Sequence, residues 1–252
     1  MDRFRRLDLS RFRQDRGFWL FVLAVLVGFA LLYTWSAVRT LFTLVALVIS
    51  ITVHECMHAW TADRLGDDTA RRLGRVTLNP ITHLDPLGSL MMLVTTVTGV
   101  GIGWGKPVPV ATHRLRFGAH MGHGLVSLAG PGANLALALL VAGIWRLSVV
   151  FVTWPTIAEQ FVLQLILVSL VIAFFNLMPI PPLDGFAVLL AAVSSIGQVW
   201  SRRLLIWMEG LYRYGWMILF GIVLLSQLAS LPLIQWLIGR PAWVLYALLT
   251  GQ

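Results

Sequence analysis

The chain has 252 residues, of which 58% are hydrophobic and 12% are charged, and its mean hydropathy is +0.82. A soluble globular protein carries roughly 25% charged residues, and a disordered chain is poor in aromatic residues. Both classes are therefore excluded. The formal charge of +8 is spread between apolar runs and forms no basic tract. We interpret it as charge that orients a membrane protein, and we expect no nucleic-acid partner.

The N-terminal residues 1–16 are rich in arginine, and the apolar run 17–37 that follows is long enough to cross a bilayer. This pattern predicts a first transmembrane helix with a basic, cytoplasmic N-terminus. A cleaved signal peptide is the alternative. It is disfavoured because the apolar run is longer than usual for such a peptide and no clear cleavage site follows.

Four further apolar segments have the length of a transmembrane helix: residues 41–61, 125–146, 157–178 and 204–229. The segment 231–249 forms a sixth span only if Arg240 and Pro241 lie near the bilayer centre, which is costly and breaks a helix. Interfacial or re-entrant pieces are an equal alternative there. We therefore predict an all-α polytopic membrane protein with five to six transmembrane helices, forming a single domain over residues 1–252.

Positive charge is concentrated between the second and third spans, whereas the opposite connections carry Arg39, Arg146 and little else. The positive-inside rule therefore places residues 63–90 and 103–122 in the cytoplasm. Within these segments, residues 72–78 and 105–110 are predicted to form short cytoplasmic or re-entrant β segments, whose edge could clamp an unwound peptide. A plain loop is the alternative for both.

The pattern that indicates chemistry is His54-Glu55-Cys56-Met57-His58, which lies inside the second apolar span. Histidines four residues apart share one face of a helix, so both imidazoles can reach one metal ion, and Glu55 can act as the general base for a metal-bound water. A pair of buried histidines without metal is the alternative. It is weaker within a membrane, where two imidazoles and a carboxylate need polar partners.

A hydrolytic zinc site needs a third protein ligand, and Asp184 is the candidate. It follows the proline-rich run 176–183, which is expected to unwind the chain directly after the fourth span. Unwound backbone at membrane depth is tolerated where it lines a polar cavity. The alternative is an ordinary proline-rich loop in which Asp184 caps the next helix.

Three motifs occur in order along the chain: His54-Glu55-x-x-His58, Gly130-Pro131-Gly132-Ala133-Asn134, and Asn176-x-x-Pro179-x-Pro181-x-Leu183-Asp184-Gly185. Together they resemble the site-2 protease family of intramembrane zinc metalloproteases, peptidase family M50. The resemblance covers residues 41–190 and implies a three-helix catalytic core there. The chain shows no insertion long enough for a PDZ or CBS domain, so it resembles a compact form of the family.

The resemblance implies that His54, His58 and Asp184 bind one Zn²⁺ per chain and that Glu55 is the catalytic base. It also implies a metalloendopeptidase that cleaves transmembrane protein substrates within or near their membrane segments. Asn134 and Asn176 are amides inside apolar spans, where we expect them either to hold the unwound loop or a substrate carbonyl, or to join helices. His83, His120 and His123 are expected to be solvated or interfacial.

Two rival functions remain from sequence. A membrane metal-ion transporter also buries histidines and carboxylates, and a non-catalytic relative could bind membrane proteins without cutting them. We expect a multi-pass protein of the lipid bilayer, in a bacterial inner membrane with the N-terminus in the cytoplasm. An organellar membrane is the alternative. The sequence does not define the oligomeric state.

Overall fold

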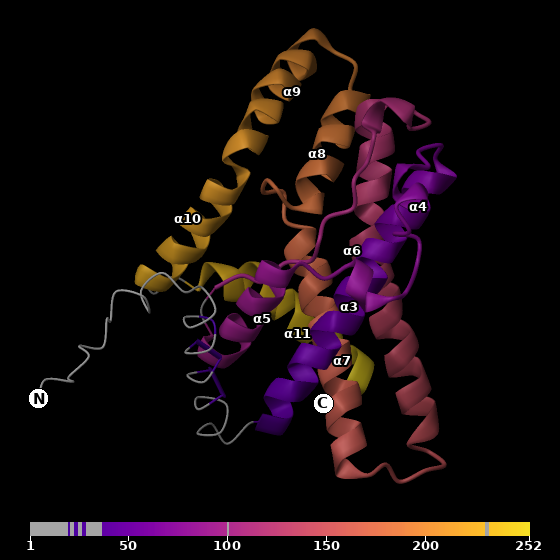
Figure 1. Ribbon diagram of the computed structural model, residues 1–252, viewed down its shortest axis with the longest axis vertical. Coiled ribbons are helices and arrows are strands. Elements are labelled where there is room, and N and C mark those ends of the chain that lie inside the picture. The colour runs from indigo at the N-terminus through magenta and orange to yellow at the C-terminus, as the bar shows by residue number, and fades with distance from the viewer. Residues whose placement is uncertain (1–19, 21–22, 25–26, 29–36, 100, 230–231) are drawn as a thin grey trace, which may run out of the picture.

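A computed structural model describes residues 20, 23–24, 27–28, 37–99, 101–229 and 232–252 (Figure 1). Every regular element among these residues is helical. Four helical segments in the described part of the chain are long and apolar enough to cross a membrane: α3 (Ala37–Arg64), α6 (Ala119–Ser148), α7 (Thr156–Asn176) and the continuous rod 199–226. They correspond to the second to fifth predicted spans. The predicted first span, 17–37, lies almost wholly outside the described residues.

Helices α3, α6 and α7 pack against one another and form the centre of the molecule. Small residues such as Ala46, Ala138 and Ala142 are fully or almost fully buried in these contacts and let the helices approach closely. Inside the bundle, the hydroxyls of Ser50 and Ser169 share a hydrogen bond of 2.9 Å between α3 and α7. Helix α8 (Asp184–Ser195) then packs along α6, so the predicted three-helix core is completed by a fourth helix.

The rod contains α9 (Val199–Leu211), the short η3 (Tyr212–Tyr214) and α10 (Gly215–Leu228), of which residues 199–226 form the candidate span. It lies along one edge of the molecule (Figure 1). Its α9 half packs on α8, with Leu205 and Met208 buried against Phe186 and Leu190. The α10 half contributes Leu219 to a second buried cluster. The rod therefore covers α8 and the loop that precedes it.

The C-terminal segment contains η4 (Gln235–Gly239), a π-helical turn, and α11 (Arg240–Thr250). Neither is among the candidate spans found in the described chain. Helix α11 instead buries Ala242 and Tyr246 against α6 and α7. The guanidinium of Arg240 lies 3.7 Å from the ring centroid of Trp236, so this charge is placed on an aromatic face.

The predicted β segments at 72–78 and 105–110 are wrong, because no strand is found in either stretch. They lie in the loops around α4 (Thr69–Arg72), η1 (Pro80–Thr82), α5 (Pro86–Thr98) and η2 (Thr112–Arg114). One isolated antiparallel bridge, between Leu84 and Gly105, is found in the described part of the chain. Pro107 and Pro109 have no N–H to donate, so the chain beyond Gly105 cannot continue a regular ladder.

Candidate metal centre

Two histidines of α3 form one side of the site. His54 and His58 are four residues apart, so their side chains lie on the same face of the helix, and they are only 5% and 8% exposed. Their ring centroids are 4.5 Å apart and the rings are nearly perpendicular. Both Nε2 atoms point to the same carboxylate oxygen.

Asp184 supplies that carboxylate from the first turn of α8. Its Oδ2 lies 3.0 Å from Nε2 of His54 and 3.3 Å from Nε2 of His58. One ligand atom from each of the three residues lies within 4.8 Å of the other two. A Cβ on Gly185 would stand 2.2 Å from the carbonyl oxygen of Leu177, so this glycine lets the proline-rich loop fold tightly and brings Asp184 back to α3.

The hydrogen bonds of His58 leave its Nε2 available to a metal. Its Nδ1 is 2.8 Å from the carbonyl oxygen of Val126, and because a carbonyl only accepts, Nδ1 carries the proton. In the neutral imidazole the lone pair is then on Nε2, which lies 3.3 Å from Oδ2 of Asp184. A ring nitrogen fixed by a backbone carbonyl is the usual partner arrangement of a metal-ligating histidine.

Gly130 lets α6 approach both imidazoles. A Cβ at this position would lie 2.4 Å from Nε2 of His58 and 2.7 Å from Nε2 of His54. The space beside the two nitrogens is therefore kept open by the absence of a side chain. The next residue, Pro131, has no N–H, so the carbonyl of Ser127 loses its usual helical partner beside the same site.

A cavity of about 520 Å³ opens onto these residues. Glu55 lines it together with all three candidate ligands, and its other walls come from α3, α5, α6, α7, α10 and the segment 102–110. A catalytic zinc site commonly has three protein ligands of this kind, here two imidazole nitrogens and one carboxylate oxygen. The carboxylate of a fourth residue, Glu55, lies at the same open cavity. The residues present thus fit a zinc ion.

The two asparagines have different surroundings. Asn176 lines the cavity, and its Nδ2 donates 3.0 Å to the carbonyl of Ile172 in its own helix. Asn134 is fully buried, and neither its Nδ2 nor its Oδ1 has a hydrogen-bond partner among the described residues. Their predicted role in holding the substrate or the loop stays a prediction.

The expectation that His83, His120 and His123 are solvated or interfacial is wrong for His83. His83 is 0% exposed, with Nε2 2.8 Å from the carbonyl of Thr77. His123 lines the cavity, whereas His120 stands 3.5 Å from Glu209 of α9. His123 could have been found from sequence, because it lies four residues before Ser127 and seven before Gly130, on one face of a helix.

The profile of peptidase family M50 matches residues 152–220. The protein "Putative zinc metalloprotease YwhC" of Bacillus subtilis is 39% identical over 155 residues, which are 59% of this chain and 67% of YwhC. The chain belongs to peptidase family M50. The prediction that the chain is an M50 metallopeptidase with an HExxH motif is thus confirmed at the level of the family.

Two further relatives also bear the name of a zinc metalloprotease. Proteins named "Putative zinc metalloprotease Rip2" from Mycolicibacterium smegmatis and Mycobacterium tuberculosis are 38% and 39% identical over 146 and 147 residues. Each match covers 56% of this chain and 53% of the relative, so this M50 chain spans about half the length of the Rip2 proteins. No solved structure matches it.

Proposed function

We propose that this chain is an intramembrane zinc metalloprotease that hydrolyses peptide bonds within or near transmembrane segments of membrane proteins. The observation that supports it best is the meeting of His54, His58 and Asp184 beside Glu55, in a cavity bordered by membrane-spanning helices. A zinc hydrolase needs three ligands, a base and an opening for substrate, and each has a candidate here.

The proposed ligands of one zinc ion are His54, His58 and Asp184. A zinc ion bound there supplies Lewis acidity toward a peptide carbonyl and lowers the pKa of a water molecule. Glu55 accepts the proton of the attacking water as the new C–O bond forms, and it returns this proton to the amine nitrogen as the C–N bond breaks. The buried hydrogen bond from His58 to Val126 holds the imidazole in the orientation that this arrangement needs.

Asn176 is proposed to orient the substrate carbonyl, because its amide lines the cavity and only one of its two Nδ2 hydrogens has a partner in Ile172. Asn134 is proposed to support the site from its position on α6. Its unpartnered amide lies on α6 four residues beyond Gly130, on the face that approaches the two imidazoles.

We further propose that the cavity receives its substrates from the bilayer and that the chain is inserted with its N-terminus in the cytoplasm of a bacterium. The arginine-rich connection between α3 and α6 supports this orientation through the positive-inside rule. Membrane protein substrates accord with four candidate spans and with membership of M50.

Metal analysis of the purified protein, combined with a cleavage assay on a panel of synthetic transmembrane peptides in liposomes, tests the proposal. We expect about one zinc per chain and cleavage products that disappear when a chelator removes the metal. Zinc-loaded protein that cleaves no member of the panel but carries metal ions across the liposome membrane would favour the transporter. Binding of the peptides without cleavage or transport would favour the non-catalytic relative.

A further inference from the structure

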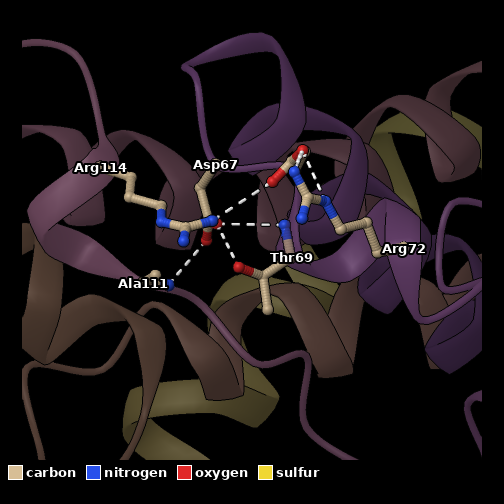
Figure 2. Close-up of polar contacts among 6 residues, drawn as sticks. Asp67, Thr69, Arg72, Ala111 and Arg114 are labelled. Carbon is tan, nitrogen blue, oxygen red and sulfur yellow. Dashed lines mark hydrogen bonds and ion pairs between the residues drawn. The ribbon is translucent and has the colours of Figure 1, made fainter.

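A buried carboxylate lies outside the metal centre, in the loop that follows α3. Asp67 is 0% exposed, and Figure 2 shows its carboxylate at the centre of a group of polar contacts. Oδ1 accepts hydrogen bonds from the backbone N–H and the hydroxyl of Thr69, at 3.1 and 2.5 Å. Oδ2 accepts a 2.6 Å hydrogen bond from the backbone N–H of Ala111, which is 44 positions away in the chain.

Ala111 directly follows a segment that lines the cavity. Residues 102–105, 107, 108 and 110 line the cavity that contains Glu55. We call residues 102–110 the wall segment. It contains no regular helix or strand. Apolar packing of Ile102 and Val110 and a few individual hydrogen bonds hold it in place.

The other tethers of the wall segment lie near its middle. The N–H of Lys106 donates to the carbonyl of His83 at 2.7 Å, and the guanidinium of Arg75 donates to the carbonyls of Thr82 and Lys106 at 2.5 and 3.4 Å. Beyond Lys106, no backbone hydrogen bond is found from Val108 or Val110 to another described residue. Asp67 therefore supplies the hydrogen bond at the far end of the wall segment, next to Val110, which packs on the cluster of Ala62, Leu115 and Val126.

Asp67 also belongs to the end of the helix that carries the proposed base. Its backbone N–H donates to the carbonyl of Ala62 in α3 at 2.9 Å, and α3 holds His54, Glu55 and His58. Asp67 thus links the end of this helix to the wall segment by hydrogen bonds. The packing of Val110 on the cluster of Ala62, Leu115 and Val126, and the 2.8 Å bond from the N–H of Arg116 to the carbonyl of Leu65, join the same two parts of the chain. The neighbouring Asp68 makes exposed ion pairs with Arg72 and Arg114 at 2.5 and 3.3 Å and contacts no residue of the wall segment in the described structure.

We propose that Asp67 is a positioning residue, which fixes the wall segment relative to the α3 metal and base residues and so shapes the part of the cavity that grips a peptide substrate. The binding of a peptide in this cavity rests on the proposed function. The placement of the wall segment by Asp67 does not. Asp67→Asn keeps the size of the side chain and removes an acceptor, whereas Asp68→Asn removes a neighbouring charge without touching the tether. The two substitutions are matched tests.

The first experiment measures the wall directly and needs neither metal nor substrate. Spin labels are placed at Thr61→Cys and Thr112→Cys in a Cys56→Ser background, and the distance distribution between them is measured by pulsed electron spin resonance in lipid nanodiscs. We expect a narrow distribution in the parent and in Asp68→Asn, and a broadened or displaced one in Asp67→Asn. An unchanged distribution in Asp67→Asn would overturn the proposal.

The second experiment separates grip from general stability. Binding of a tripeptide hydroxamate with apolar side chains is compared with binding of acetohydroxamate, which reaches only the metal. We expect Asp67→Asn to weaken the tripeptide hydroxamate about tenfold, with acetohydroxamate affinity and zinc content close to those of the parent when both proteins are measured well below the melting temperature of the variant. The same split should appear as a raised KM with little change in kcat on any cleaved peptide.

The outcomes are distinguishable. If the folded Asp67→Asn protein binds both hydroxamates like the parent, and the variant merely loses stability or active fraction, Asp67 has only a structural role and the proposal is wrong. If the parent itself binds neither hydroxamate, the proposed zinc function fails, while the spin-label distances still decide whether Asp67 places the wall.

Discussion

Oδ2 of Asp184 lies 3.0 Å from Nε2 of His54, although the two residues are 130 positions apart in the chain. Three local features produce this approach: the i, i+4 histidines of α3, the small residue Gly130 on α6, and the tight loop before α8. A disturbance of any of them should therefore affect metal binding before it affects the fold.

Gly130→Ala tests the close approach of α6 to the two imidazoles by adding one methyl group. The new Cβ would stand 2.4 Å from Nε2 of His58, so the imidazoles must move away from their common point. We expect zinc affinity to fall by about 10–100-fold, the range seen when residues supporting metal ligands are changed. Zinc titration with a competing chelator measures it.

Gly132→Ala is the matched control, because a Cβ there meets nothing within 4 Å. It adds the same methyl group to the same helix and should leave zinc affinity unchanged. Equal affinities in the two variants would show that the close approach of α6 to the histidines is not needed.

His123 is expected to contribute to turnover through its place in the cavity wall. His123→Ala removes a hydrogen-bonding group from a mostly apolar surface and should lower kcat/KM about tenfold, a loss of about 1.4 kcal/mol of transition-state stabilisation. His120→Ala, which removes the imidazole paired with Glu209 on α9, should change kcat/KM much less. Initial rates on a cleaved transmembrane peptide decide it, and similar rates for parent and His123→Ala would refute this contribution.

Asp67 should make stability depend on acid pH. Burial alone raises the pKa of this carboxyl, but the hydrogen bonds from Thr69 and Ala111 and the charge of Arg114 outweigh burial and lower the pKa below its ordinary value of 3.8. A lowered native pKa stabilises the fold above the ordinary value, and this contribution is lost as the pH falls through and below about 4. Thermal unfolding between pH 6 and 3 should show a shallower decline in Asp67→Asn than in the parent.

The orientation in the membrane is tested by labelling single cysteines in a Cys56→Ser background. A cysteine at Asp68, in the arginine-rich connection, should react in intact cells only with a reagent that crosses the membrane. Its modification by an impermeant reagent added to the outer face would reverse the orientation. A cysteine at Val150, exposed in the connection between α6 and α7, should show the opposite pattern.

The helices and the proposed ligands were predictable from sequence for different reasons. Long apolar runs specify spans such as α6 and α7 because the bilayer requires that length. His54 and His58 need only helical spacing to share a face. The proline-rich run before Asp184, by contrast, indicates a metal ligand and a helix cap equally, and only the resemblance of the whole motif favours the ligand.

The errors have a common origin in tertiary contacts. Residues 105–110 alternate in a way that is typical of a strand, but no partner strand lies beside them and two prolines lack donors. The burial of His83 and the tether from Asp67 to Ala111 depend on loops that meet only in the folded chain. Local pattern carries no information on either contact.

The most direct test of the central claim measures zinc content and cleavage together in Glu55→Gln and Asp184→Ala. Glu55→Gln keeps the shape of the side chain and all three proposed ligands, so zinc should remain at the parent level while cleavage of a transmembrane peptide falls below detection. Asp184→Ala removes a ligand, so zinc and cleavage should fall together. Cleavage at the parent rate by Glu55→Gln, or zinc bound as tightly by Asp184→Ala as by the parent, would contradict the proposed mechanism at that residue.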